Sequence, residues 1–527
     1  MVSITVYDGA TTIGGTKIYI EEKNEGIFLD FGMNFAKYQE FFQEFLTERS
    51  ARGIYDLIYL NIIPKLNNYR KDLIPSDLRI TEFPELKVKA VLLSHAHMDH
   101  CGNISLLNPD IPIVASPTSI SILKALRDVS TSRFGTEIAY YSPKHPIDDK
   151  GRVLASGKEN YIGRTFFCTT AYSESLENFL SGLPGQEANK SQNGEEAPNK
   201  RKAPKKRKQL NAGQLCNLNE LKLPFEIEAY DVDHSIFGAT AYILRGESTI
   251  AYTGDFRLHG KNASKTKEFI DKAKDASILI IEGTRVERAD INDSEETVFQ
   301  NCLQIVEDSE KLVVADFSAR NFERLETFKR IAEKTGRQLV VTAKDIYMLH
   351  GIECADGICR IENLLIYNEP RAKRDNWETS VVKADWNEKY VTYDVISSNP
   401  EKYILCFSFY DLKHLLDIQP QGGSYIYSSS EAFSEEQEFD FRRLWKWLKF
   451  FNFNIHGFEL ITNEGELQPS FMRGYHVSGH VSKSELEETI DTIDPDCIIP
   501  VHTTNPQWFR DTFEKVIIPT EGQEIDF

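Results

Sequence analysis

Three histidines and one aspartate occupy positions within a run of six residues, directly after an apolar, strand-like segment. They are His95, His97, Asp99 and His100. Neutral imidazole and carboxylate are ligands for zinc and neighbouring divalent ions. Side chains two apart in an extended segment project to the same side, so His95 and His97 can bind one ion while Asp99 and His100 face another position. The spacing therefore allows two adjacent metal ions.

Further acidic and imidazole residues stand at the ends of other strand-like runs. These residues are Asp30, His234, Asp255, Glu282 and His502. Because α/β proteins collect ligands at the carboxyl ends of their strands, we expect one sheet edge to gather these groups. Two interpretations of Asp30 stay open: it orients a metal-bound histidine, or it only caps the next segment.

The elements that position these residues alternate between strand and helix, which predicts an α/β fold. Strands are expected at residues 3–7, 17–20, 89–94, 111–115, 240–244 and 278–282, and helices at 34–49, 118–128 and 483–493. A second α/β module is expected from about residue 289 to 465, with a long helix over 435–450. Aromatic residues of that helix could stack on bases, but their helical spacing favours packing in a core.

Composition limits the classes of function. A chain of 527 residues is too long for one ordinary core, so at least two domains are expected. The formal net charge of -19 argues against a broad basic surface for DNA or anionic membrane. Eight scattered cysteines without a CxxC pair fit free thiols in a reducing compartment. We therefore expect a cytoplasmic protein with no membrane segment.

Residues 173–222 differ in composition from the rest of the chain. Glycine, asparagine, serine, proline and glutamate lead into a run at 200–208 with seven positive charges in nine residues. Such composition cannot bury a core, so a flexible basic insertion is expected. The run could bind a phosphate backbone or act in nuclear import, and a solvated linker is the alternative.

Together these residues resemble the metallo-β-lactamase superfamily and, within it, the β-CASP nucleases of the ribonuclease J and polyadenylation branches. Residues 95–100 match the superfamily signature, while Asp30, His234 and Asp255 match its first, third and fourth motifs. The β-CASP motifs A, B and C are matched by Glu282, His480 and His502. The resemblance implies a metallo-β-lactamase αββα sandwich over 1–288 and 466–527, with a β-CASP α/β domain inserted at 289–465.

The resemblance also implies a site with two divalent metal ions, with zinc favoured over manganese. The first ion would be held by His95, His97 and His234, the second by Asp99, His100 and His502, with Asp255 bridging them. Asp99, His480 and Glu282 would be catalytic. Asp99 would position the attacking water, and His480 with Glu282 would protonate the leaving oxygen or stabilise its developing charge. His476, Ser478 and His480 would bind an RNA phosphate, although His476 stays open between that role and an ordinary loop histidine.

The implied activity is hydrolysis of single-stranded RNA, by exonucleolytic or endonucleolytic cleavage or both. In this family a histidine at the motif C position goes with RNA substrates, and this chain has His502 there. The alternatives are a DNA nuclease, a non-catalytic RNA-processing subunit and a small-molecule hydrolase. Glu282-Gly283-Thr284 departs from the Asp-Ser-Thr of ribonuclease J, and no C-terminal dimerisation domain is expected, so a homodimer stays open.

Overall fold

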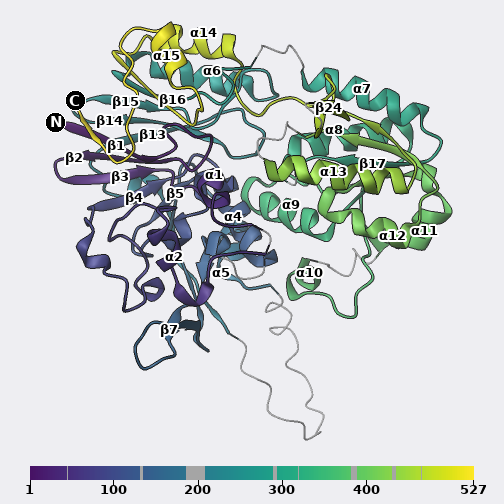
Figure 1. Ribbon diagram of the computed structural model, residues 1–527, viewed down its shortest axis with the longest axis horizontal. Coiled ribbons are helices and arrows are strands. Elements are labelled where there is room, and N and C mark those ends of the chain that lie inside the picture. The colour runs from purple at the N-terminus through teal and green to yellow at the C-terminus, as the bar shows by residue number, and fades with distance from the viewer. Residues whose placement is uncertain are drawn as a thin grey trace, which may run out of the picture.

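The computed structural model of the protein describes most of the chain (Figure 1). The described residues are 1–43, 45–130, 134–184, 208–288, 294–318, 320–381, 388–429, 435–463 and 466–527. The basic run at 200–207 lies outside them, and Lys208 is the first described residue after it. Among the described residues, no helix is both long and apolar enough to cross a membrane.

Two sheets lie face to face in the half of the molecule that contains both termini (Figure 1). The eight-stranded sheet has the order β12-β10-β5-β4-β3-β2-β1-β27. Its strands are β1 (Val2–Asp8), β2 (Lys17–Glu22), β3 (Glu25–Leu29), β4 (Val88–Leu92), β5 (Ile113–Ala115), β10 (Phe166–Cys168), β12 (Leu215–Asn217) and β27 (Glu524–Asp526). The five-stranded sheet comprises β13 (Glu226–Asp231), β14 (Thr240–Arg245), β15 (Thr249–Tyr252), β16 (Ile278–Glu282) and β26 (Cys497–Val501).

A continuous apolar core fills the space between these sheets. In β1 the alternating residues Val2, Ile4 and Val6 are fully buried in it, as the two-residue period of a strand requires. The antiparallel register places Ile4 opposite Ile20 of β2, so the same face continues across the hairpin. Residues of β14, β15, β16 and β26 complete this core from the other sheet.

Helices cover the outer face of each sheet and complete a four-layer arrangement (Figure 1). On the side of the eight-stranded sheet lie α1 (Phe35–Gln39), α2 (Tyr55–Tyr59), α4 (Pro117–Val129) and α5 (Glu174–Ser181). On the side of the five-stranded sheet lie α6 (Ala263–Lys272), α14 (Lys483–Ile493) and α15 (Gln507–Thr512). The predicted αββα sandwich is therefore confirmed.

A seven-stranded parallel sheet forms the other half of the molecule. Its order is β20-β19-β18-β21-β17-β22-β23, with strands β17 (Leu312–Asp316), β18 (Gln338–Val341), β19 (Leu364–Tyr367), β20 (Tyr390–Val391), β21 (Tyr403–Cys406), β22 (Gly423–Tyr427) and β23 (Phe453–His456). Its helices are α7 (Glu295–Asp308), α8 (Phe322–Thr335), α9 (Ala343–Asp356), α10 (Asn376–Val381), α11 (Tyr393–Ser398), α12 (Leu415–Ile418) and α13 (Glu435–Phe450). All of these elements lie between β16 and β26 in sequence, which confirms an inserted α/β unit. The domain limits 1–288, 289–465 and 466–527 remain a prediction.

The helix α13 has the predicted limits, and its apolar face packs in a core. Phe441, Leu444 and Leu448 are buried against the seven-stranded sheet, and Trp445 and Trp447 pack at the margin of the same cluster. Helical spacing thus indicated core packing correctly for these residues.

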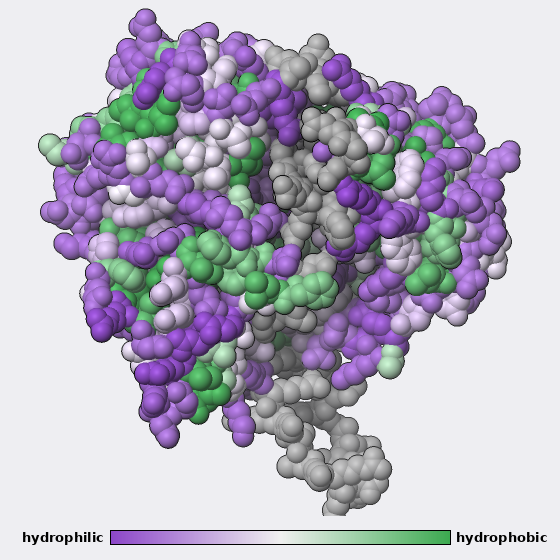
Figure 2. Space-filling model, in the orientation of Figure 1, coloured by the Kyte–Doolittle hydropathy of each residue, from purple (hydrophilic) through white to green (hydrophobic). Residues whose placement is uncertain are grey.

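The helix predicted at 34–49 is wrong beyond Gln39, where α1 ends. Its apolar spacing is helical, but only Tyr38 and Phe42 pack inward, and Gln43 and Leu46 form an isolated antiparallel bridge. Phe45 is 93% exposed, so the inward face that would stabilise a longer helix is missing. Figure 2 shows apolar residues gathered around α1 on an otherwise largely hydrophilic face.

The insertion predicted at 173–222 is also too wide. Residues 174–181 form α5, and residues 215–217 form β12, which pairs with β10 in the eight-stranded sheet. Leu176 is fully buried, and the side chain of Ser173 caps α5. Composition averaged over the whole segment obscured these short elements at its two ends.

Candidate metal centre and catalytic site

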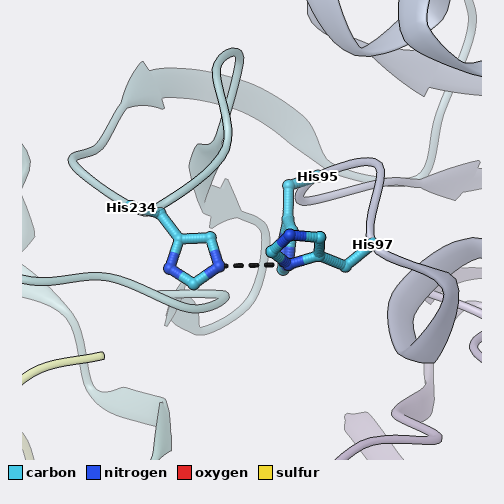
Figure 3. Close-up of side chains that lie close together, drawn as sticks. All are labelled: His95, His97 and His234. Carbon is cyan, nitrogen blue, oxygen red and sulfur yellow. Dashed lines mark hydrogen bonds between the residues drawn. The ribbon is translucent and has the colours of Figure 1, made fainter. Parts of the chain in front are cut away.

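Three imidazoles converge where the loop after β4 meets the loop after β13 (Figure 3). His97 Nδ1 lies 3.0 Å from His95 Nε2 and 3.2 Å from His234 Nε2. His97 is also the residue before the short helix α3 (Met98–Cys101), so the chain turns directly after the first two histidines. Burial lowers the pKa of His95 and His234, and burial followed by the charge of Arg320 lowers that of His97 to about 3. The three rings are therefore neutral, which is the ligand form of imidazole.

A second group lies beside the first and consists of Asp99, His100 and His502. Asp99 Oδ2 is 3.3 Å from His502 Nε2 and 3.9 Å from His100 Nε2. His502 directly follows β26 with a positive φ of 51°, and its N–H donates to the carbonyl of Gly9. A left-handed backbone is unusual for a residue with a β-carbon, and here it places the ring beside residues four hundred positions earlier.

Asp255 lies between the two groups. Its Oδ2 is 3.1 Å from His100 Nε2, 3.7 Å from His95 Nε2, 3.8 Å from His502 Nε2 and 3.9 Å from His234 Nε2. Burial opposes ionisation of Asp255, but the nearby imidazoles outweigh it and lower its pKa well below the usual range. A central carboxylate with imidazoles on both sides is the arrangement expected of a ligand shared by two ions.

The buried polar atoms of the cluster fit a bound cation. Asp255 Oδ1 and His100 Nε2 are both inaccessible to solvent and make no hydrogen bond within the described residues. A buried carboxylate oxygen and a ring nitrogen without partners are costly unless something else satisfies them. The two groups, with Asp255 between them, offer seven nitrogen and oxygen atoms that would satisfy these unpartnered atoms by holding two divalent ions.

Asp30 orients one of these ligands. Its Oδ2 lies 2.8 Å from His100 Nδ1, and its two oxygens accept from the N–H and the hydroxyl of Ser94, each at 2.7 Å. The hydroxyl of Tyr252 in the opposite sheet donates to the same Oδ2 at 2.6 Å. Of the two interpretations of Asp30, these contacts favour the one in which it fixes His100, because a carboxylate on Nδ1 directs Nε2 toward the metal position.

His480 and Glu282 form a pair at the edge of the cluster. His480 Nδ1 is 2.9 Å from Glu282 Oε2 and 3.8 Å from Asp255 Oδ2. Burial disfavours the charged ring, but Glu282 and Asp255 outweigh it and raise the pKa of His480 to about 9. Thr284 donates to Glu282 and lies 3.0 Å from His502 Nδ1, which links this pair to the second group.

The loop before α14 joins the pair to the first group. The carbonyl of Gly479 lies 2.6 Å from His234 Nδ1, and the hydroxyl of Ser478 accepts from the N–H of His480. His476 stands apart from the metal groups, with its ring 6.1 Å from that of Phe471. The structure thus brings the seven predicted ligands together with His480 and Glu282, while the roles of all these residues, and those of His476 and Ser478, remain predictions.

Residues 63–134 match the family described as the metallo-beta-lactamase superfamily. This range contains β4, α3 and four of the clustered ligands. This segment of the chain is related to the metallo-β-lactamase superfamily. A relationship to this superfamily agrees with the groups of side chains described above, which could hold divalent metal.

The chain is also similar to individual proteins. Ribonuclease J of Sinorhizobium meliloti is 21% identical over 441 residues, which cover 82% of this chain. The chain spans 60% of the length of that relative. A protein of unknown function from Enterococcus faecalis V583 has the same fold, with a TM-score of 0.65, 21% identity and 99% coverage of both chains. The metallo-beta-lactamase fold protein YhfI of Bacillus subtilis covers 55% of this chain and 75% of its own, at 13% identity, but its TM-score of 0.25 supports no argument.

The clustered residues come from two sheet edges, whereas the sequence led us to expect one. Asp30 and the 95–100 segment follow β3 and β4 of the eight-stranded sheet, while Asp255 and His502 follow strands of the five-stranded sheet. Strand-end positions can be recognised in a sequence, but they do not show which sheet each strand joins.

Several residues that support the site carry no recognisable motif. Arg257 is buried, and it donates to Asp233, to Glu323 of α8 and to the carbonyl of Ser478. His259 lies 3.1 Å from that same carbonyl. These contacts hold the loop that carries His480. The only local signal for Arg257 was its place two residues after Asp255.

Proposed function

We propose that this protein is a metal-dependent ribonuclease that hydrolyses phosphodiester bonds of single-stranded RNA. The observation that carries the proposal is the His480–Glu282 pair, which stands 3.8 Å from the central carboxylate of Asp255. A metal cluster alone suits many hydrolytic reactions, whereas an adjacent imidazole held by a carboxylate can also serve the leaving group. The relationship to ribonuclease J and the β-CASP-like motif order support the same proposal.

In this proposal each residue of the cluster has a defined task. One divalent ion would be held by His95, His97 and His234, and a second by Asp99, His100 and His502. Asp255 would contact both ions. Two such ions would supply the positive charge that activates water and polarises the phosphate. Zinc is favoured, and manganese suits the same nitrogen and oxygen ligands.

Asp99 and His480 would act on the reacting groups. The Asp99 side chain is 26% exposed, so it is accessible to a substrate and could position the attacking water through a hydrogen bond. His480 is fixed through Nδ1 by Glu282, which leaves Nε2 to give a proton to the departing oxygen. Glu282 is itself held by the N–H of Phe256 at 2.9 Å, so the imidazole has a rigid support.

Cleavage of matched oligonucleotides tests the proposal. RNA and DNA of the same sequence, labelled at either end and bearing a 5′-monophosphate or a 5′-triphosphate, would be incubated with the protein and Zn²⁺ or Mn²⁺. Asp255→Ala protein purified in parallel controls for contaminating ribonuclease. We expect preferential cleavage of RNA, and the position of the label in the products separates exonucleolytic from endonucleolytic cutting.

The rival functions predict different outcomes of that assay. Faster cleavage of DNA would indicate a DNA nuclease with the same metal centre. No cleavage of either polymer by protein shown to contain metal would indicate a non-catalytic subunit or a small-molecule hydrolase. Either result would overturn the proposal, and wild-type activity equal to that of Asp255→Ala would show that the cleavage is a contaminant.

A further inference from the structure

Arg320 reaches from the seven-stranded sheet to the metal-binding loop. It follows β17 at the carboxyl end of the strand, and its Nη1 donates to the carbonyl of Ala96 at 2.8 Å. Ala96 stands between the ligands His95 and His97. Arg320 therefore places a guanidinium directly beside the metal centre.

The guanidinium of Arg320 is only partly used by the protein. Within the described residues the Ala96 carbonyl is its one hydrogen-bond acceptor, and it forms no ion pair with a described carboxylate. Arg257 and Arg324, at the same interface, instead pair with buried carboxylates. Because a guanidinium has five N–H donors in a planar fork, most of those of Arg320 are still available to a ligand.

The charges of the site indicate why a free guanidinium there would help to bind a phosphate. The carboxylates of the site are Asp30, Asp99, Asp255 and Glu282. Two divalent ions would only balance these four negative charges when all are ionised, so the ions alone give the site no surplus positive charge. A protonated His480, which pairs with Glu282, would add a single positive charge. A phosphodiester bound at the site would therefore be stabilised by a further cation beside it.

We propose that Arg320 binds a phosphate of the substrate beside the metal centre. This inference rests on the proposed function, because it assumes a phosphodiester substrate. The Ala96 carbonyl holds one N–H of the guanidinium, and the fork directs other N–H groups to the non-bridging oxygens of the phosphate. Arg320 is thus the contribution of the inserted unit to substrate binding at a centre built by the sandwich.

Binding of a single-stranded 2′-O-methyl RNA oligonucleotide to metal-loaded protein tests this role. Fluorescence anisotropy would be measured over a range of salt concentrations, and a gel run after each titration would verify that the oligonucleotide is intact. Arg320→Gln removes the charge but keeps an N–H donor for Ala96. We expect about tenfold weaker binding, since hydrogen bonds to charged groups contribute on this scale. The slope of log K against log salt should become shallower by about 0.7.

Two further variants separate phosphate binding from support of the metal loop. Arg320→Lys should restore the salt slope but only part of the affinity, because lysine lacks the fork. Arg337→Ala is the matched control, since Arg337 also donates to backbone carbonyls but precedes β18 at the opposite edge of the same sheet. Its binding should equal that of the wild type.

The metal content of each variant, measured by mass spectrometry, decides between the outcomes. Arg320→Gln with wild-type metal content and weakened binding supports the inference. Wild-type affinity and slope in Arg320→Gln would overturn it, and weakened binding accompanied by lost metal would show that Arg320 only supports the loop. A wild-type protein that binds no oligonucleotide would instead overturn the proposed function.

Discussion

Replacing Asp30 by alanine removes an acceptor that joins the two sheets of the sandwich. Asp30 is fully buried and accepts two hydrogen bonds from Ser94 and one from Tyr252, and it also holds His100 Nδ1. Each buried donor left without an acceptor costs about 1–3 kcal/mol. The variant also keeps the positive φ of 56° with a β-carbon, which costs about 1–2 kcal/mol without the local hydrogen bonds of aspartate.

These contributions are not additive, because water can enter part of the space that Asp30 leaves. We expect Asp30→Ala to lower the free energy of unfolding of the metal-free protein by about 3–5 kcal/mol, as for other broken buried polar networks. Urea denaturation at fixed pH gives this value from the midpoint and slope. A loss smaller than 1 kcal/mol would refute the assignment of Asp30 as the acceptor that joins the sheets.

Two further replacements of Asp30 separate its roles. Asparagine tolerates the left-handed backbone and keeps one oxygen for the N–H of Ser94, but its amide nitrogen cannot accept from His100 or from the hydroxyl of Tyr252. Asp30→Asn should therefore lose less stability than Asp30→Ala, because the backbone strain is relieved and one acceptor remains, yet bind Zn²⁺ about 10- to 100-fold more weakly than the wild type, as measured by competition with a chelator. Asp30→Gly also removes the acceptor but relieves the backbone strain. Its free energy of unfolding should therefore be about 1 kcal/mol higher than that of Asp30→Ala.

Other substitutions test the ligands and the packing around them. His97→Ala and Asp255→Ala should each lose bound metal and cleavage together, and normal metal content by mass spectrometry in either variant would contradict the ligand assignment. His480→Ala should keep its metal but lose about 100-fold or more in kcat, as expected for loss of a general acid, so unchanged kcat would exclude that role. Gly32→Ala should destabilise the fold by about 1–3 kcal/mol, because a β-carbon there would lie 1.7 Å from the carbonyl oxygen of Asp99, and an unchanged urea midpoint would show that the backbone yields freely.

The residues of the cluster could be predicted because each carries a local signal. His95, His97 and Asp99 occupy alternate positions of one short segment, and Asp255 and His502 each follow a short apolar run that forms a strand. The apolar runs themselves identified most strands, since a buried strand needs only a few consecutive apolar residues. The chemistry of the cluster therefore required no knowledge of which strands are neighbours.

The supporting residues could not be predicted because their partners are distant and of ordinary types. Arg257, Glu323 and Arg324 look like surface residues of amphipathic segments, yet all three are buried. Helical periodicity likewise overextended α1, because its signal does not report whether a core exists for the apolar face. The role of Arg320 could not be predicted from its charge, because only the fold brings it to the carbonyl of Ala96.

Buried arginines link the sandwich to the inserted unit. Arg324 of α8 pairs with Glu295 and also donates to the carbonyls of Ser428, after β22, and Tyr475, in the loop that leads to His480. Arg257 reaches from the sandwich to Glu323 of the same helix. Breaking such an ion pair would leave a buried charge without its partner, which costs about 3–5 kcal/mol for each pair. An interface of this kind opposes movement of the inserted unit against the sandwich, so under the proposed function a substrate would be selected by its ability to reach the metal centre as a single strand and not by closure of the inserted unit.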